Sequence, residues 1–471
     1  MRILLAAAAA TLLAACASQP AKSGSTSSNS TSTASKPASF IDDPYPSTYQ
    51  RIPSPPVLIS NATVLDGAGQ RLDGASVLMR DGKIVAVGTT IDDIPADAIH
   101  VDGSGKWVTP GIIDIHSHLG VYASPGVSAN SDGNEATAPV TAQVWAEHSI
   151  WPQDPGFLTA LAGGITSLQV LPGSANLIGG RGVTLKNIPS TTYQAMKFPG
   201  APWGLKMACG ENPKRVYGEK GGPSTRMGNV AGYRAAFADA AEYMKKRKGG
   251  DAGKRDFKND TLAGAINGDI RVHIHCYRAD EMTTMIDLAK EFGFKISAFH
   301  HGVEAYKIAD RLAAEGICGA LWADWWGFKM ESFDGIQENI VMVDRAKNGC
   351  AIVHSDSEEG IQRLNQEAAK AMANGHRIGI DIPPERAIRW ITANPAKAMG
   401  IDAMTGTLEA GKMADVVVWN GNPFSSYAQA EQVYIDGARL YDRRDPQRQP
   451  KSDFMLGQDL LLNDAKQGGA R

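Results

Sequence analysis

Two histidines stand one residue apart at the end of the apolar stretch TPGIIDIHSHLG, residues 109–120. Because side chains alternate between the two faces of a strand, His116 and His118 are expected to point to the same side. Neutral imidazoles and carboxylates are the usual protein ligands of zinc and similar divalent ions. The pair therefore predicts a metal site. The same two-residue spacing recurs later, at His273 and His275 and at His354 and Asp356.

Most of the other side chains with metal-binding potential also follow apolar, strand-like segments. Seven of the ten histidines do so, including the adjacent pair His300 and His301. Strand alternation sends these two to opposite faces, so only one of them is expected to share a face with the other histidines. Lys206 stands in the otherwise apolar segment WGLKMA. These residues can form one site only if their strands end at the same edge of a sheet.

Strand and helix patterns alternate between residues 109 and 399, which favours βα units and a parallel sheet. Helical patterns cover residues 279–292, 304–315 and 361–374. Eight strands in a segment of this length predict an α/β fold, a (β/α)8 TIM barrel, whose active site lies at the C-terminal ends of the strands. The strand candidates cover residues 107–118, 165–173, 182–187, 203–210, 270–276, 295–301, 316–323 and 350–356.

Both flanks of this central segment have short β-rich pieces separated by Asp-Gly and Gly turns, which are typical of hairpins. We expect residues 53–108 and 400–445 to form one discontinuous small β-sandwich domain, followed by a C-terminal tail at 446–471. Four cysteines follow position 200: Cys209, Cys276, Cys318 and Cys350. Each lies in or beside an apolar run and no CxxC motif is present, so we expect buried thiols rather than a disulfide scaffold.

The ordered set of motifs resembles the metal-dependent amidohydrolase superfamily. The resemblance rests on HSH, HIHCYRADE, HHGVEAYKIAD, HSD and the closing TANPAKAMGIDAMTGTLEAGKMADVVVW, and it covers residues 56–440. The stretches GGITSLQVLPGSANLIGGRG and GLKMACGENPKRVYG resemble its imidazolonepropionase- and prolidase-like branch. The resemblance implies one or two divalent ions, Zn²⁺ being the first choice. Its ligands would be His116, His118 and Asp356 for the buried ion, His275 and His301 for the exposed ion, and a carbamate on Lys206 as the bridge.

Several residues near these ligands have alternative roles. Lys206 could pair with Glu291 instead, and Glu211 could bridge the metals through its carboxylate. His273 and His354 are expected to orient the ligands from one pleat below them. His300 is expected to be structural. These alternatives stay open at the level of the sequence.

The resemblance also implies a reaction. Many deaminases of the superfamily place a glutamate three residues after the histidine of the fifth strand, where this chain has Arg278. This difference favours hydrolysis of the C–N bond of an amide, a peptide (as a dipeptidase or prolidase would) or a cyclic amide by a metal-bound hydroxide, with Asp356 as general base and then general acid. The alternatives are a mononuclear, imidazolonepropionase-like lactam hydrolase and a metal-binding lipoprotein without catalytic activity.

Substrate contacts are expected in the loops that follow the strands. Arg181, Lys214, Arg215 and Tyr217 could hold a carboxylate of a small-molecule or short-peptide substrate, although ordinary surface charge explains the cations equally well. The segment WADWWG at 322–327 could form an aromatic pocket wall or pack in the core. The net charge of −3 at pH 7 gives no reason to expect nucleic acid as a partner.

The N-terminus carries an export signal. A cationic start and an apolar run too short for a membrane span lead to LAAC, which resembles a bacterial lipobox. By that resemblance residues 1–16 are a lipoprotein signal peptide and Cys16 is acylated; a plain signal peptide is the alternative. The Ser/Thr-rich segment that follows predicts a flexible tether over 17–52. We therefore expect a periplasmic protein anchored by lipid at Cys16, with the outer membrane favoured because Ala17 offers no inner-membrane retention signal.

Overall fold

The computed structural model describes residues 41–124, 126–250, 253–325 and 327–449. The expected signal peptide with Cys16 and most of the expected C-terminal tail lie outside the described residues. No helix in the described ranges is both long and apolar enough to cross a bilayer. The structure therefore bears on the central segment and its two flanks.

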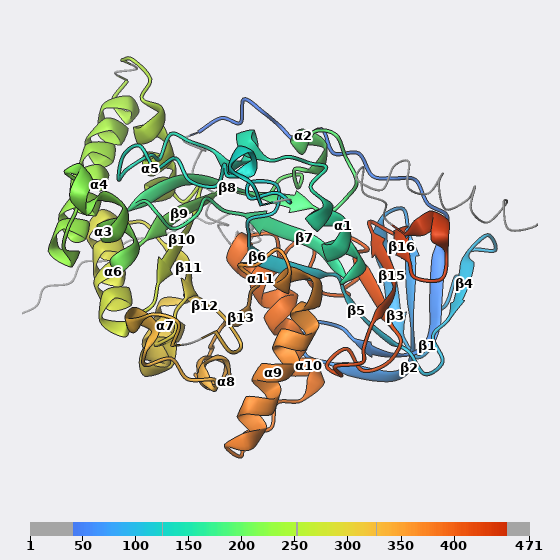
Figure 1. Ribbon diagram of the computed structural model, residues 1–471. Helices are drawn as coiled ribbons and strands as arrows, with labels where there is room; N and C mark the ends of the chain where they lie inside the picture. Colours follow the sequence, from blue (N-terminus) through green and yellow to red (C-terminus); the bar gives the residue numbers. More distant parts are fainter. Residues whose placement is uncertain (1–40, 125, 251–252, 326, 450–471) are drawn as a thin grey trace, which may run out of the picture. The chain divides into compact units, whose positions relative to one another are not determined.

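Eight strands form the predicted barrel, and neighbours in the chain are neighbours in the sheet (Figure 1). Nearly all of their residues are buried, as expected for strands that are covered on both faces. The strands are β6 (Ile112–Ser117), β7 (Ile165–Val170), β8 (Ile178–Lys186), β9 (Gly204–Ala208), β10 (Arg271–Cys276), β11 (Ile296–His301), β12 (Cys318–Leu321) and β13 (Ala351–Val353). The α/β class and the TIM barrel are thereby confirmed.

Hydrogen bonds between the first and last strands bring the ends of the sheet together. The backbone N–H of Asp356 donates to the carbonyl oxygen of His116 over 3.0 Å. The side chain of Asp114, within β6, accepts hydrogen bonds from the backbone N–H and the hydroxyl of Ser355. This closure places the residues that follow β13 directly beside the end of β6.

The third strand differs from a regular (β/α)8 barrel. β8 runs antiparallel to both β7 and β9, and it begins four residues before the predicted segment 182–187. Only residues 171–177 separate β7 from β8, whereas a parallel crossover needs a dozen residues or more. The chain therefore returns in a hairpin, and the barrel has one reversed strand.

Helices follow most of the later strands, and α6 shows why they form where they do. Met282, Met285, Ile286 and Ala289 give it one buried face at helical spacing, and Gly293 ends it in the left-handed conformation at φ 80°. The helices are α1 (Pro155–Ala162), α2 (Tyr193–Met196), α3 (Glu211–Tyr217), α4 (Arg226–Lys248), α5 (Phe257–Asn267), α6 (Ala279–Phe292), α7 (Ala309–Glu315), α8 (Asn339–Arg345), α9 (Leu364–Arg377), α10 (Pro384–Ala387) and α11 (Ala393–Met399).

A second eight-stranded sheet takes strands from both flanks of the barrel, in the order β16-β15-β14-β5-β1-β2-β3, with β4 paired to β1. A bridge between Lys83 and Met413 joins the edge strand β3 to the segment before β14, so the sheet curls around its own apolar core. The strands are β1 (Val57–Leu65), β2 (Arg71–Arg80), β3 (Lys83–Gly88), β4 (Ile99–Asp102), β5 (Trp107–Pro110), β14 (Val416–Trp419), β15 (Ala430–Ile435) and β16 (Ala438–Asp442).

Two predicted boundaries move. The first strand candidate, 107–118, is two strands: β5 pairs with β1 and β14 in the second sheet, and β6 enters the barrel after Gly111. The predicted tether also ends earlier than residue 52. Residues from Ile41 onward pack on the folded protein, where Asp43 pairs with Lys197 at 3.0 Å and the Tyr49 hydroxyl bonds Asp436.

The four cysteines form two disulfides, Cys209–Cys276 and Cys318–Cys350, so the prediction of buried free thiols is wrong. The members of each pair are 67 and 32 residues apart in the chain, but they lie on neighbouring barrel strands. Barrel register brings their Cα atoms to 5.2 and 4.6 Å, within the range that a disulfide can span. The pairing follows from strand order, which the spacing of cysteines does not reveal.

Candidate active site

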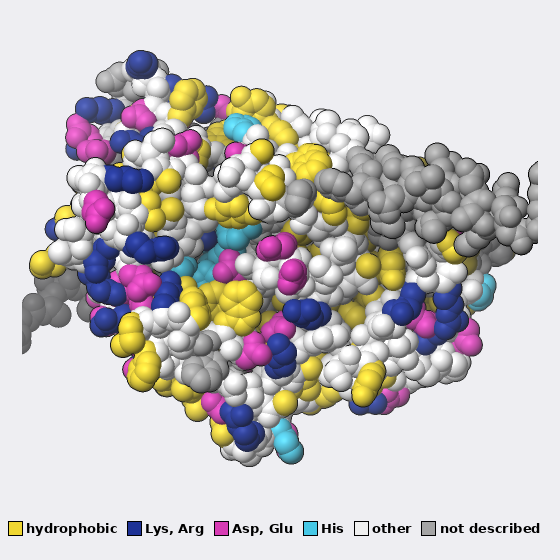
Figure 2. All heavy atoms as spheres, viewed as in Figure 1, with side chains coloured by type: hydrophobic (Ala, Val, Ile, Leu, Met, Phe, Trp, Pro, Cys, Tyr) yellow, Lys and Arg dark blue, Asp and Glu magenta, His cyan; other side chains and the backbone are white. Residues whose placement is uncertain are grey.

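Histidines from several strands meet at the C-terminal end of the barrel, where Figure 2 shows their side chains at the floor of a hollow. The cluster contains two groups of potential metal ligands, and within each group the ligand atoms all lie within 4.8 Å of one another. The first is His116, His118 and Asp356, the set that the resemblance assigns to the buried ion. The second is His116, His301 and His354. The structure thus brings the paired residues of β6 and β13 together.

The first group has its polar atoms turned toward one point. Asp356 Oδ1 lies 3.3 Å from His116 Nε2 and 3.2 Å from His118 Nε2. The Nδ1–H of His118 donates to the carbonyl oxygen of Leu171 over 2.9 Å, which leaves Nε2 with a lone pair for a ligand bond. The carboxylate of Asp356 is 21% exposed, so it also faces the hollow. A ligand and a proton acceptor are available in the same group.

The second group and His275 lie next to the first. The rings of His275 and His301 are 4.7 Å apart, and each has a buried Nδ1 without a hydrogen-bond partner among the described residues. His301 Nδ1 lies 3.9 Å from Asp356 Oδ2. His275 Nε2 accepts a hydrogen bond from the amide of Asn212 over 3.3 Å. Both ring nitrogens of His354 also have no partner within the described part of the chain. His354, expected only to orient the ligands, is therefore within reach of a metal. The two-residue spacing between His354 and Asp356 is the sequence signal that could have indicated this role.

Lys206 reaches the cluster from β9. Its Nζ lies 3.4 Å from His116 Nε2 and donates to the carbonyl oxygen of Pro172 over 3.0 Å. Burial lowers the pKa of Lys206 to about 8, against the opposing effect of Asp356. The two alternative interactions are not formed. Glu291 pairs with Arg234 on the surface and not with Lys206, and Glu211 pairs with Lys329 at 3.3 Å.

Two of the clustered residues have a left-handed backbone. His301 has φ 72° and Asp356 has φ 53°, in a region that few residues other than glycine adopt. The turn at His301 changes the direction of its side chain, so the prediction that His300 and His301 diverge is wrong. Both rings contact His116, at centroid distances of 4.8 and 4.7 Å.

A chain of three buried imidazoles lies below the candidate ligands. His116 Nδ1 is 2.8 Å from His300 Nδ1, and His300 Nε2 is 2.9 Å from His273 Nδ1. All three residues are completely buried. If His116 binds a metal through Nε2, its Nδ1 carries the proton and donates to His300, which in turn donates to His273. His300 therefore has a defined orienting position.

Burial sets the charge of the cluster. It lowers the pKa of His273 to about 3 and that of His354 to about 4, and it lowers the pKa of His116, His275, His300 and His301 well below the usual value. These imidazoles are neutral at pH 7, which is the state that ligates metals. Burial also raises the pKa of Asp114 to about 7, although its hydrogen bonds from Ser355 and His116 oppose the rise.

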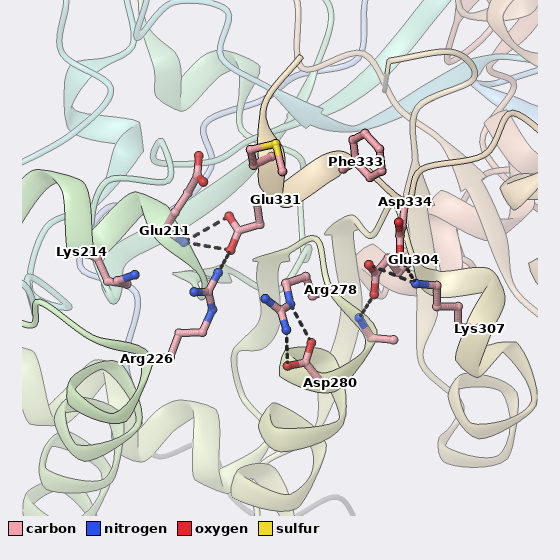
Figure 3. A pocket seen from close by; sticks show the side chains of 12 residues that line it. Glu211, Lys214, Arg226, Arg278, Asp280, Glu304, Lys307, Glu331, Phe333 and Asp334 are labelled. Atoms are coloured by element: carbon pink, nitrogen blue, oxygen red, sulfur yellow. Dashed lines mark hydrogen bonds and ion pairs between the residues drawn. The ribbon is translucent and has the colours of Figure 1, made fainter. Parts of the chain in front are cut away.

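A cleft of about 790 Å³ opens beside the histidines, between the loops that follow β9, β10, β11 and β12 (Figure 3). Most of the cations on its wall are paired, Arg226 with Glu331 and Arg278 with Asp280. Lys214 has no partner among the described residues. Asn212 lies between this cleft and the cluster, because it follows Glu211 of the cleft wall and bonds His275. A substrate in the cleft would reach the histidines past α3.

The other three predicted substrate residues lie in different surroundings. Arg215 is exposed on α3, next to Lys214 in the cleft wall, whereas Tyr217 is buried. Arg181 is buried between the rings of Trp145 and Trp203, 4.1 and 5.0 Å from their centroids, and donates to Thr261 of α5. The side chain of Arg181 thus points away from the histidines toward a helix outside the barrel, and the structure does not bring it to a substrate.

Comparisons with known proteins identify the family. A family model described as the amidohydrolase family matches residues 107–440. The chain belongs to this family. The family is metal-dependent, and the structure has the His/Asp cluster that such a metal needs. The protein is accordingly a hydrolase that acts on carbon–nitrogen bonds, as the motifs predicted.

Three relatives show how far the similarity extends. The crystal structure of an amidohydrolase from Thermotoga maritima is 38% identical with a TM-score of 0.75, and the match covers 82% of this chain and 100% of that one. A protein of Hapsidospora irregularis named amidohydrolase tasK is 32% identical over 395 residues, 78% of this chain but 40% of its own length. An imidazolonepropionase of Chromobacterium violaceum is 25% identical over 411 residues, 79% of this chain and 90% of its own.

Proposed function

We propose that this member of the amidohydrolase family is an exported enzyme that hydrolyses an amide bond of a short peptide, an N-acylated amino acid or a cyclic amide. The observation that carries the proposal is Asp356. Its carboxylate contacts both His116 and His118 and also faces the hollow, so it can act as a ligand and exchange a proton with a substrate.

The donor set fits a metal ion. Ring nitrogens of His301 and His354 lie within 4.8 Å of a ring nitrogen of His116, and His116 Nε2 lies 3.3 Å from His118 Nε2. The burial that keeps these imidazoles neutral would be costly without a ligand. Nitrogen donors with one carboxylate suit Zn²⁺. Such an ion supplies a Lewis acid that polarises a carbonyl and lowers the pKa of water.

The chain's own residues supply the proton transfers. Asp356 takes a proton from the attacking water and then gives it to the nitrogen of the leaving group, so that the amine departs neutral. Burial lowers the pKa of Lys206 to about 8, so a fraction of this side chain is a neutral amine near pH 7. Formation of a carbamate requires the neutral amine. As a carbamate it would offer two oxygens to two metals, which is the bridging role that the family resemblance assigns to it.

The position of Arg278 supports hydrolysis over deamination. A deaminase needs a carboxylate near the ring nitrogen of its substrate to carry a proton, and three residues after His275 this chain has an arginine paired with Asp280. The free ammonium of Lys214 and the exposed guanidinium of Arg215 instead favour a substrate that ends in a carboxylate.

A mononuclear lactam hydrolase is the second candidate. One observation favours it: an imidazolonepropionase is among the relatives, and the similarity covers 90% of that protein's length. The stoichiometry of bound metal distinguishes the two candidates, since the binuclear site predicts two ions per chain and the mononuclear site predicts one.

The proposed location is the periplasmic side of the cell envelope, with a lipid anchor at Cys16. The two disulfides between barrel strands support an oxidising compartment, because such bonds rarely persist in the cytosol. Mass spectrometry of the mature N-terminus tests the anchor. A diacylated Cys16 is the expected result, and an unmodified N-terminus elsewhere would contradict it.

A substrate screen tests the proposed reaction. The zinc-loaded protein is offered Xaa-Pro and other dipeptides, N-acyl amino acids and lactams, with the chelated protein and Asp356→Asn as controls. We expect release of an amine from at least one class by the loaded wild-type enzyme alone. Turnover that is the same in all three samples would contradict the proposal.

A further inference from the structure

The loop between β12 and α8, residues 322–338, exposes an unusual number of large apolar side chains. Trp325 is 43% exposed and Phe328 is 56% exposed, and Met330 and Phe333 are exposed further still. Isolated surface hydrophobics are common, but a group of four within nine residues marks a binding surface. The loop follows a barrel strand at the end where the histidines lie, so this surface borders the candidate active site.

Aromatic rings connect this loop directly to a candidate metal ligand. The ring of Trp322 stacks on His301 with centroids 4.2 Å apart and an interplanar angle of 29°. Trp325 stacks on Trp322 at 5.2 Å and 26°. Phe328 meets Trp322 edge to face at 5.7 Å and 78°. The rings therefore form a continuous apolar wall from His301 to the surface.

Core packing explains only the inner part of this wall. Trp322 is 9% exposed and lies in a small buried cluster with Tyr277 and Val303. Trp325 and Phe328 pack one side of each ring on this cluster and leave much of the other side to solvent. In Figure 2 hydrophobic side chains lie immediately beside the histidine floor of the hollow.

Charged groups lie next to this apolar wall. Lys329 Nζ lies 4.3 Å from the centroid of the Tyr277 ring and pairs with Glu211 at the end of α3. Phe328 also meets Tyr277 edge to face at 6.2 Å. In Figure 3 Phe333, from the same loop as Phe328, stands beside the charged side chains of the cleft. A substrate that enters here meets apolar rings and ionic groups close together.

We propose that Trp322, Trp325 and Phe328 form a subsite for a large apolar or aromatic side chain next to the scissile carbonyl of the substrate. This inference rests on the proposed amide hydrolysis and names its substrate class. A carbonyl held beside His301 has its α-substituent only two bonds away from the carbonyl carbon. Trp322 is buried between His301 and Trp325, so it backs the subsite, and the exposed parts of Trp325 and Phe328 supply its surface. The enzyme therefore prefers acyl residues such as phenylalanine, tryptophan and leucine over alanine and glycine.

The test uses five dipeptides with one common C-terminal residue and Gly, Ala, Leu, Phe or Trp at the N-terminus. Full burial of an aromatic side chain predicts a kcat/KM roughly 10–100-fold higher for Phe than for Ala in the wild-type enzyme. Phe328→Ala and Trp325→Ala should each remove roughly 10-fold of this ratio. Tyr427→Ala, at an 87% exposed aromatic between β14 and β15, is the matched control and should change neither rate.

Binding separates the subsite from the reaction. Calorimetry with phenylalanine and alanine, the acyl products of two of the test dipeptides, should give the same preference, and Phe328→Ala should reduce it in the same proportion. If this preference persists but the substrate screen finds no cleavage of any amide, the subsite stands and the proposed reaction is wrong. Equal binding and equal kcat/KM for the Phe and Ala compounds overturn the subsite. It is also overturned if Phe328→Ala alters the sedimentation of the protein and leaves specificity unchanged, because the apolar surface would then join copies of the chain.

Discussion

Replacement of His300 by leucine tests whether the buried imidazole chain orients the metal ligands. The wild-type ring has its two nitrogens 2.8 Å from His116 Nδ1 and 2.9 Å from His273 Nδ1, in a site without solvent access. With a metal on His116 Nε2, it accepts a hydrogen bond from His116 and donates one to His273. Leucine fills a similar volume but leaves both partners unsatisfied. Each unsatisfied buried group costs about 1–3 kcal/mol, so unfolding of the metal-free protein should require roughly 2–6 kcal/mol less free energy. Zinc affinity should fall by roughly 10–100-fold, the usual effect of losing the partner that orients a ligand.

His300→Gln is the matched control, because a glutamine amide offers one acceptor and one donor in place of the two ring nitrogens. Urea unfolding of the metal-free proteins and competition for zinc with a chromophoric chelator measure the two effects. We expect the glutamine variant to recover most of the zinc affinity. A folded leucine variant with wild-type zinc affinity would refute the orienting role. A glutamine variant as weak as the leucine variant would show that packing, and not hydrogen bonding, sets the affinity.

Three further predictions concern the site itself. Asp356→Asn should keep the fold and lower turnover by roughly 10²–10⁴-fold, the effect of losing a general base, and near-normal turnover would contradict the proposed chemistry. Lys206→Ala should lower the metal content measured by elemental analysis, and addition of a short carboxylic acid should partly restore it. Glu211→Gln should keep the wild-type metal content. The reverse result would assign the bridging role to Glu211. For substrates with a free terminal carboxylate, Arg215→Met should lower kcat/KM by a factor that corresponds to about 1.5–3 kcal/mol of transition-state stabilisation. An equal loss on the same substrates with an amidated terminus would exclude this contact.

Local rules predict from the sequence several of the side chains that come together at the barrel mouth. His116 Nε2 lies 3.3 Å from His118 Nε2, as strand alternation predicts, and His354 and Asp356, which follow β13, each lie in one group with His116. Barrel topology then places strand ends together regardless of their distance in the chain. The eight strand candidates can also be found from the sequence, because apolar runs of this length are typical of strands that are buried on both faces.

Other features depend on contacts that no local pattern encodes. The reversed direction of β8 follows from the short connection after β7, and it takes Arg181 to α5 instead of the barrel mouth. The contact of His301 with His116 depends on the left-handed backbone at His301, which a strand pattern does not anticipate. Disulfide pairing likewise depends on which strands become neighbours.

Anomalous diffraction at the zinc edge from crystals of the zinc-loaded protein tests the central claim most directly. We predict an ion within about 2.0–2.2 Å of His116 Nε2, His118 Nε2 and a carboxylate oxygen of Asp356. A second ion, beside His275 and His301, is expected if Lys206 is carbamylated. An ion bound elsewhere, or a protein that remains fully active with no ion at His116, His118 and Asp356, would contradict the account.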